Sequence, residues 1–237
     1  MFVNLKKFLR DPLGFLKRAY LKLIIGPRKY GSKEDGYEAA SYWNDRFSKY
    51  GYSLQGAGDE SVSVEENKKM YHEAASVFRS MLQDEQIDFP NINVLEIGVG
   101  AAFYTGQLQE LGVTHYTGID IADVLFEQHQ QKFPQYRFIR QDVTKSPIEG
   151  QYDLIIMIDV SQHIVKEDKI KAAFDHIKHG LAPRGCFLIM PLADQSKKHH
   201  YYVHVWAPEF VKRHFSEYAI REGALFRGGR SLIIKKR

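Results

Sequence analysis

A turn that could bring the chain backbone close to a ligand, Gly98–Val99–Gly100, follows the strand-like run Val94–Ile97. Glycine permits backbone dihedrals closed to other residues, and the first strand-to-helix turn of a doubly wound sheet binds nucleotide-like ligands. A dinucleotide site would need a third glycine at the position of Phe103. Glu96 lies two residues before the first glycine, where its carboxylate would repel a pyrophosphate and attract an ammonium group. The turn therefore favours a cationic ligand without phosphate.

Two more carboxylates follow the next two strand-like segments. Asp120 comes after Tyr116–Ile119, where it can accept hydrogen bonds from both hydroxyls of a ribose. Asp142 comes shortly after Tyr136–Ile139, where it can accept a hydrogen bond from the amino group of an adenine. One such acid is common as a helix cap or turn residue. Three acids in this order indicate S-adenosylmethionine (SAM), which carries a sulfonium, an ammonium, a ribose and an adenine.

The block from about Ile92 to Met190 resembles the core of the class I SAM-dependent methyltransferases. Its matching segments are Glu96–Gly100, Asp120, Asp142, the fourth strand and loop over 153–164, and the turn over 181–185, where Arg184 replaces a frequent glycine. The resemblance implies an α/β fold: a doubly wound, seven-stranded, mostly parallel sheet with an antiparallel last strand and an N-terminal helical extension. It also implies SAM as the cofactor, with the pocket residues Glu96, Gly98, Gly100, Asp120, Ile121, Asp142, Val143 and Asp159.

Candidates for a catalytic base follow the fourth strand. Methyl transfer to a hydroxyl requires alignment of the reactants and removal of a proton. Asp159 and His163 lie in the loop expected to face the sulfonium, and an unperturbed histidine has a pKa of about 6.5. The alternative is that His163 only packs or orients the loop, and that Asp159 borders the cofactor.

The acceptor is expected between two aromatic segments. One follows the fifth strand and contributes His200, Tyr202, His204 and Trp206, and the other contributes Tyr42 and Trp43 from a helix before the core. A solvated tyrosine-rich loop and ordinary core packing are the respective alternatives. We predict no metal site, because His199 and His200 are adjacent and no third ligand is suitably spaced.

Strand-like and helix-like segments alternate after Pro90, which predicts a parallel sheet covered on both faces. The expected strands are 93–97, 116–119, 136–139, 154–158 and 186–190, and the expected helices are 104–111, 124–132 and 168–179. A helix over 208–214 and an antiparallel pair over 217–221 and 231–235 close the chain. Ser63–Glu66 has capping-box spacing and begins a further helix. Residues 31–62 are expected to be largely irregular around a helix over 42–50.

The net charge of +4 is concentrated in an N-terminal arm. Residues 1–30 hold eight Lys or Arg and a single acid, and apolar residues recur between them as in two short amphipathic helices, the second ending at Gly26–Pro27. Such an arm can lie on a membrane, dock on the protein itself or pair with a second copy. We therefore divide the chain into this arm (1–30), a helical lead-in (31–90) and a SAM-binding domain (91–237).

Composition narrows the partners. The body outside the arm is mildly acidic and shows no basic aromatic groove, so nucleic acid is not expected. No apolar run is long enough to span a membrane, charges interrupt any signal-like stretch, and the single Cys186 favours a reducing, cytoplasmic setting. The expected partners are a small-molecule or glycan/lipid-linked acceptor, methylated at oxygen, peripheral membrane contact at an inner face through residues 1–30, and a homodimeric copy.

Two other functions are compatible with parts of the pattern. A nicotinamide-dependent oxidoreductase shares the glycine turn and an acid after the second strand, but Phe103 and Glu96 argue against it. A non-catalytic membrane-associated protein could keep the fold and work through its arm. Such a scaffold has no need of the combination of glycines and acids.

Overall fold

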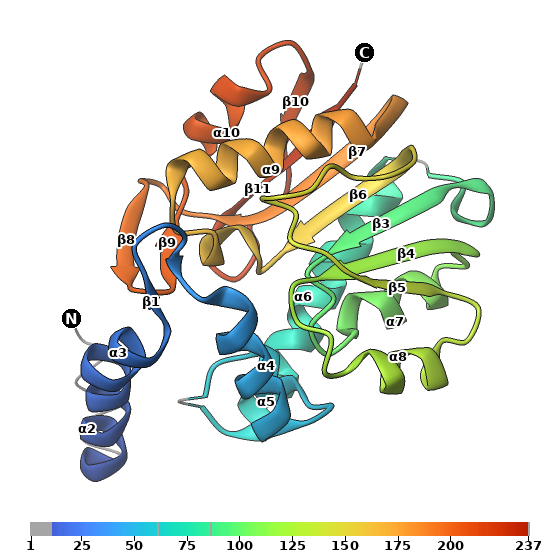
Figure 1. Ribbon diagram of the computed structural model, residues 1–237. Coiled ribbons are helices and arrows are strands. Elements are labelled where there is room, and N and C mark those ends of the chain that lie inside the picture. Colours follow the sequence, from blue (N-terminus) through green and yellow to red (C-terminus); the bar gives the residue numbers. More distant parts are fainter. Residues whose placement is uncertain (1–10, 61, 86, 237) are drawn as a thin grey trace.

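The computed structural model describes residues 11–60, 62–85 and 87–236, and its centre is a seven-stranded sheet (Figure 1). The strand order is β10-β11-β7-β6-β3-β4-β5. β3, β4, β5, β6 and β7 pair in parallel, while β11 is antiparallel to both of its neighbours. The expected doubly wound sheet with an antiparallel last strand is confirmed. The strands are β3 (Asn93–Ile97), β4 (His115–Asp120), β5 (Arg137–Arg140), β6 (Tyr152–Ile158), β7 (Leu181–Leu192), β10 (Ala219–Glu222) and β11 (Arg230–Lys235).

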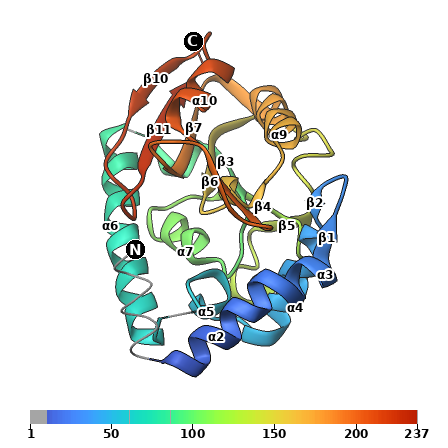
Figure 2. The same ribbon diagram turned by 90° about the vertical axis from the view of Figure 1, so that its left-hand side faces the viewer.

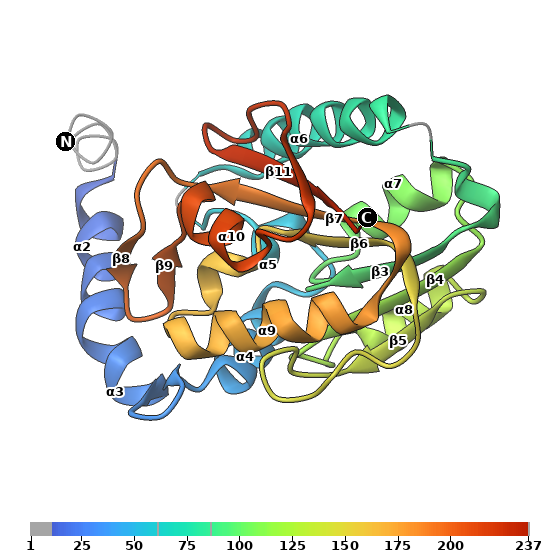
Figure 3. The same cartoon turned by 90° about the horizontal axis from the view of Figure 1, so that it is seen from above.

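Two layers of helices cover the sheet, one on each face (Figures 2 and 3). One layer contains α6 (Val64–Asp84), α7 (Phe103–Glu110) and α8 (Phe126–Lys132), and the other contains α9 (Glu167–Gly180) and α10 (Pro208–His214). α6 begins with the expected capping box, in which Ser63 and Glu66 each bond the other's backbone N–H. Short 3-10 turns, Phe89–Asn91 and Ser161–His163, precede β3 and follow β6.

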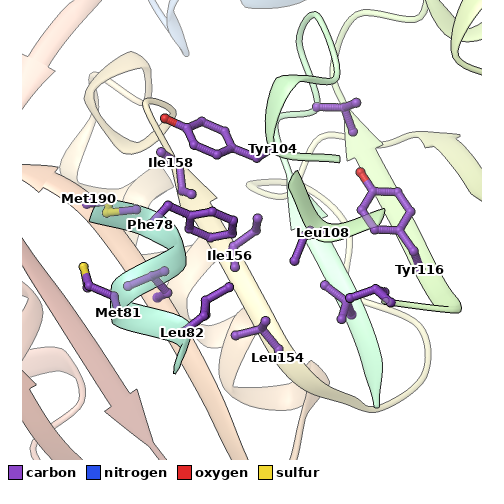
Figure 4. Close-up of a cluster of buried hydrophobic side chains, with 14 of the residues drawn as sticks. Phe78, Met81, Leu82, Tyr104, Leu108, Tyr116, Leu154, Ile156, Ile158 and Met190 are labelled. Carbon is purple, nitrogen blue, oxygen red and sulfur yellow. The ribbon is translucent and has the colours of Figure 1, made fainter. Parts of the chain in front are cut away.

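The alternation of side chains along β6 explains how one strand serves both layers. Leu154, Ile156 and Ile158 face α6 and α7, whereas Ile155 and Met157 face α9. Figure 4 shows the first set meeting Phe78 of α6. Because both faces are covered, the strand is apolar throughout rather than alternating with polar residues.

The segment before the sheet holds more regular structure than the sequence predicts. α4 (Ala39–Tyr50) contains the expected helix over 42–50, but a hairpin of β1 (Gly31–Ser32) and β2 (Gly36–Tyr37) precedes it and α5 (Leu54–Ala57) follows it. Two-residue strands and a single helical turn are too short to leave a periodic signal in sequence. In Figure 1, α4 and α5 lie beyond the carboxyl ends of the central strands.

The arm is one continuous helical segment in its described part. α2 (Pro12–Tyr20), a π-helical turn (Leu21–Ile25) and α3 (Gly26–Tyr30) follow one another without a break. The expected end at Gly26–Pro27 is therefore wrong. A π-helical turn widens the backbone just before Pro27, which relieves the clash between a proline ring and the preceding turn. The other expected amphipathic stretch, over residues 2–9, lies outside the described residues.

A second small hairpin, β8 (Lys197–His200) and β9 (Val203–Val205), follows β7 and lies beside the arm (Figure 3). Contact between the two is direct, because a Cβ atom on Gly26 would fall 2.5 Å from the Tyr201 hydroxyl. Within residues 11–60, 62–85 and 87–236, no helix has the length and apolarity needed to cross a bilayer.

Candidate active site

A cavity of about 700 Å³ opens at the carboxyl ends of the central strands. It lies where the strand order reverses between β3 and β6, which is the usual ligand site of an open α/β sheet. The cavity gathers residues from four strand ends, from α4 and from the loop after β6. The predicted site residues that line it are Gly98, Gly100, Asp120, Ile121, Asp142, Val143, Asp159, His163 and Trp43.

The glycine turn forms the floor of this cavity. Gly98 has φ +81° and Gly100 has φ +52°, in the left-handed region that glycine adopts without strain. A Cβ atom on Gly98 would fall 2.1 Å from a methyl group of Val160, so no larger residue fits there. The bare backbone leaves room for a ligand to lie directly on the turn.

Asp120 fixes the shape of that turn. One carboxylate oxygen accepts a hydrogen bond from the backbone N–H of Gly100, and the other accepts one from the N–H of Ala122, both at 2.9 Å. Burial raises the pKa of Asp120, and these backbone hydrogen bonds act in the opposite direction. The carboxylate thus lies at the end of β4 with further acceptor capacity, as a ribose site requires.

At the other side of β4, Asp142 and Val143 line the cavity beyond the end of β5. Asp142 accepts hydrogen bonds from the backbone N–H and the hydroxyl of Thr144, at 2.9 and 2.7 Å. The β1–β2 hairpin reaches this end of the cavity, where Asp35 pairs with Lys145 at 2.8 Å and Lys169 at 3.0 Å. Sequence analysis missed this contact, because the hairpin is too short to be recognised.

Glu96 lies beneath the floor rather than in the cavity. Its side chain is buried and accepts hydrogen bonds from the hydroxyls of Tyr116 at 2.6 Å and Thr105 at 2.8 Å. Burial raises its pKa to about 7, against the effect of these two donors. The structure therefore places this carboxylate between α7 and β4, and Glu96 is absent from the cavity lining.

Helices α4 and α5 cover the turn from above. A Cβ atom added to Gly100 would lie 3.6 Å from the Phe47 ring and 3.7 Å from the Ala57 methyl group. Arg46 holds the two helices together, since its guanidinium donates to the carbonyl oxygens of Gly56 and Gly58 and to Glu60. A ligand on the turn would be enclosed between the sheet and this cover.

His163 contributes a neutral imidazole to the cavity wall. Its Nδ1 lies 3.0 Å from the carbonyl oxygen of Tyr202, and its ring meets the Trp43 ring edge-on at 4.8 Å. Burial lowers the pKa of His163 to about 4. Within the described part of the chain, Nε2 has no hydrogen-bond partner.

The remaining predicted acceptor residues lie behind the wall. Tyr42 and Tyr202 stack at 4.8 Å in a tyrosine cluster, and His200 stacks on Tyr202. Trp206 is buried beneath His204, with its indole N–H donating to carbonyl oxygens of the loop that carries His163. Of the six predicted acceptor residues, the structure brings only Trp43 into the cavity lining.

At the far end of the cavity, the predicted residue Asp159 lies near Arg227, Tyr71 and Tyr104, which the sequence did not assign to the site. Asp159, in a left-handed conformation with φ +58°, lies 3.5 Å from the guanidinium of Arg227 in the β10–β11 loop. That guanidinium stacks over the ring of Tyr71, 4.3 Å from its centre, and Tyr71 and Tyr104 line the cavity. An arginine before Gly228–Gly229 carries no sequence signal for a contact reaching α6.

The described residues contain no group of three or more potential metal ligands.

Comparison with known proteins identifies the central part of the chain. Residues 94–185, which hold the glycine turn, both strand-end acids and the loop after β6, match the model of a methyltransferase domain. Residues 94–185 are therefore a methyltransferase domain, and the fold around them is that of the class I methyltransferases. The match favours a methyltransferase over a nicotinamide-dependent oxidoreductase as the interpretation of the glycine turn, and a solved structure with the same fold holds SAM.

Solved methyltransferases share the fold. The magnesium protoporphyrin IX methyltransferase of Synechocystis, with bound S-adenosylhomocysteine (SAH), superposes with a TM-score of 0.61 at 19% identity, covering 84% of this chain and 98% of that one. An amino pentose methyltransferase from Micromonospora echinaspora, with bound SAM, superposes with a TM-score of 0.56 at 14% identity, covering 74% and 98%.

Curated relatives match over part of this chain. The malonyl-[acyl-carrier protein] O-methyltransferase of Bacillus cereus is 30% identical over 92 residues, which are 38% of this chain and 33% of the relative. The squalestatin hexaketide synthase of Cochliobolus lunatus is 26% identical over 147 residues, 55% of this chain and 5% of the relative. The chain thus spans a third or less of the length of these relatives.

The residues that line the cavity are suited to SAM. Asp120 and Asp142 offer carboxylate oxygens at one end, and the bare backbone of Gly98 and Gly100 leaves room at the centre. Asp159 has a buried oxygen without a hydrogen-bond partner among the described residues. Such an oxygen suits the ammonium group of SAM.

Proposed function

We propose that this protein transfers the methyl group of SAM to a hydroxyl oxygen of a small-molecule or glycan/lipid-linked acceptor, with His163 as the general base. The observation that carries the proposal is the tautomer of His163. A carbonyl oxygen only accepts hydrogen bonds, so the contact with Tyr202 requires the proton on Nδ1. The lone pair of Nε2 is then free in the wall of the cavity.

The bound cofactor would supply an electrophilic methyl group. SAM would transfer its methyl group to the acceptor oxygen and leave as SAH, and Nε2 of His163 would accept the hydroxyl proton. The oxygen becomes strongly acidic as it gains the methyl group, so a base as weak as this buried histidine suffices. Trp43, edge-on to the imidazole, would hold the acceptor against it.

The similar proteins act on varied acceptors. The Bacillus cereus relative is an O-methyltransferase of malonyl-acyl carrier protein, whereas a similar structure is that of a glycopeptide N-methyltransferase. In our proposal, the presence of a base is the only feature that favours an oxygen acceptor over a nitrogen acceptor. An amine nucleophile can react as its free base, while a hydroxyl gains from a proton acceptor in the transition state.

The arm supports an acceptor at a membrane surface. Leu13, Leu16 and Leu23 are 82%, 56% and 65% exposed, and Lys17 and Lys22 lie between them in sequence. Apolar side chains flanked by lysines suit an anionic lipid surface. α3 at the end of the arm contacts the tyrosine cluster through Tyr201, so docking would place the cavity wall close to lipid-linked acceptors. A homodimer through the same face is the second use of the arm that we propose to test.

The first test is calorimetric titration with SAH of the wild type and of Asp120→Ala. We expect micromolar binding that the variant loses. Methyl transfer from labelled SAM to hydroxyl-bearing glycans and lipid-linked intermediates, compared with their amine analogues, then tests the acceptor. A preference for amines, undiminished by His163→Gln, would contradict oxygen methylation.

Vesicle sedimentation tests the arm. We expect binding to anionic but not neutral vesicles, abolished when Leu13, Leu16 and Leu23 are all replaced by Glu. Leu225→Glu is the control, because Leu225 is also exposed but lies in the β10–β11 loop. If both variants bind vesicles equally well, membrane docking is contradicted. A larger mass for the wild type than for the triple variant in light scattering would indicate a dimer instead.

A further inference from the structure

Asp159 lines one end of the cavity, and its side chain forms an ion pair with Arg227 directly behind that lining. The carboxylate oxygen Oδ2 and Nη1 are 3.5 Å apart, and the two side chains are 22% and 16% exposed. The two residues come from distant parts of the chain, the loop after β6 and the loop between β10 and β11. The adenosine-side acids, Asp120 and Asp142, follow β4 and β5 on the other side of the glycine turn.

This pair leaves much of its bonding capacity unused. Among the described residues, Oδ2 of Asp159 and both Nε and Nη2 of Arg227 are buried without a hydrogen-bond partner. Tyr104 lines the cavity, and its hydroxyl is likewise buried without a hydrogen-bond partner among the described residues. Buried polar groups are normally satisfied. An ion pair that served only to hold the loop would use its donors on the protein.

The chemistry of the unused groups is that of a receptor for an amino-acid zwitterion. A guanidinium presents several N–H donors in one plane and can hold a carboxylate with two parallel bonds. A carboxylate beside it accepts from an ammonium group. The tail of SAM carries these two groups on one carbon atom, and the ion pair presents their two complements side by side.

We propose that Arg227 binds the carboxylate of the SAM tail while Asp159 binds its ammonium group, so that the β10–β11 loop is part of the cofactor site. This inference rests on the proposed function. The stacking of Arg227 over Tyr71 fixes the guanidinium plane, because Tyr71 is itself held in the core by α6. The alternative ligand for Arg227 is an anionic group of the acceptor, and the experiment separates the two.

The test compares two ligands that differ in the tail. SAH carries the complete amino-acid tail, whereas 5′-methylthioadenosine keeps the adenosine and the sulfur and lacks both charged groups. We expect Arg227→Met to weaken SAH about tenfold or more by calorimetry, as for the loss of a charge-assisted hydrogen bond. The affinity for 5′-methylthioadenosine should change less than twofold.

Arg230→Met is the matched control, because Arg230 begins β11 nearby and pairs with Asp194 and Glu222. It should leave both affinities unchanged. Asp159→Asn should reproduce the selective loss of SAH through the ammonium group, and it tests the proposal even if Arg227→Met does not fold. Arg227→Lys should restore part of the SAH affinity.

The outcomes are distinguishable. Equal weakening of both ligands by Arg227→Met and Asp159→Asn would overturn the zwitterion site and indicate a general effect on the fold. Unchanged SAH binding in Arg227→Met would overturn it in favour of the acceptor's anionic group. A wild type that binds neither ligand would overturn the cofactor assignment itself, and the further inference with it.

Discussion

The imidazole Nδ1 of His163 lies 3.0 Å from the carbonyl oxygen of Tyr202, and this contact determines the tautomer of the ring. The two residues are brought together by the loop after β6 and by the turn between β8 and β9. Trp206 holds the loop in place through two backbone carbonyl oxygens. The aromatic segment after β7 therefore packs behind the loop that carries His163, and its predicted acceptor residues do not line the cavity.

The first prediction concerns the chemical step. His163→Gln should lower kcat about 100-fold with little change in KM, because a positioned base contributes roughly that factor and is used in the transition state. His72→Gln is the control, since His72 is exposed on α6. Steady-state kinetics with the acceptor found by screening provide the measurement. A variant whose KM rises while kcat stays the same would assign His163 to binding.

The second prediction is the pH profile. The pKa of His163 is lowered to about 4 by burial, so Nε2 is unprotonated and active above that pH. The rate should therefore be flat from about pH 5.5 upwards and fall only towards pH 4. The pH dependence of kcat/KM reports the free enzyme. An acid limb near the ordinary histidine pKa of about 6.5 would show that another group is titrating.

The sheet and its glycine turn could be predicted from sequence because their signals are local. Continuous apolar runs such as Leu154–Ile158 identify buried parallel strands, and the turn at Gly98 needs a backbone that only glycine allows. Asp120 was likewise foreseeable, since the carboxyl ends of neighbouring parallel strands share one edge. These inferences needed no knowledge of distant contacts.

The far end of the site depends on contacts that no local pattern encodes. Arg227 meets Asp159 only because β11 returns to the sheet beside β7. Glu96 shows the converse, since its position in the motif suggested a ligand contact. Because side chains alternate along the strand, its side chain points to the face covered by α7. There the hydroxyls of Thr105 and Tyr116 donate hydrogen bonds to it.

The third prediction follows from the burial of Glu96. Burial raises its pKa in the folded protein to about 7, from an ordinary value of 4.5, so the folded protein binds a proton more tightly than the unfolded chain. The stability of the wild type relative to Glu96→Gln is then fully present below pH 4.5 and is lost as the pH rises to 7. The slope should be roughly 1 kcal/mol per pH unit.

Urea unfolding of both proteins at several pH values between 4.5 and 8 measures this difference. Glu127→Gln on the exposed face of α8 should show no such slope. A difference between wild type and Glu96→Gln that does not vary with pH would mean that Glu96 titrates alike in the folded and unfolded chains.

The last prediction concerns the cover formed by α4 and α5. The side chain of Arg46 is only 9% exposed and donates to Gly56, Gly58 and Glu60 at 2.5 to 2.7 Å. Arg46→Met would leave Oε1 of Glu60 and two carbonyl oxygens without the donor that they share, at a cost of about 1 to 3 kcal/mol each where they stay buried. Opening the cover would lower this cost, because it exposes these groups to water.

Hydrogen exchange of residues 51–60 should therefore accelerate while that of β6 stays slow. SAH should bind about tenfold more weakly, because the turn at Gly100 is no longer enclosed. Arg79→Met, which removes a surface pair with Glu110, should change neither quantity. Accelerated exchange throughout β6 would instead show that Arg46 supports the whole domain, because a local cover cannot loosen the central strand.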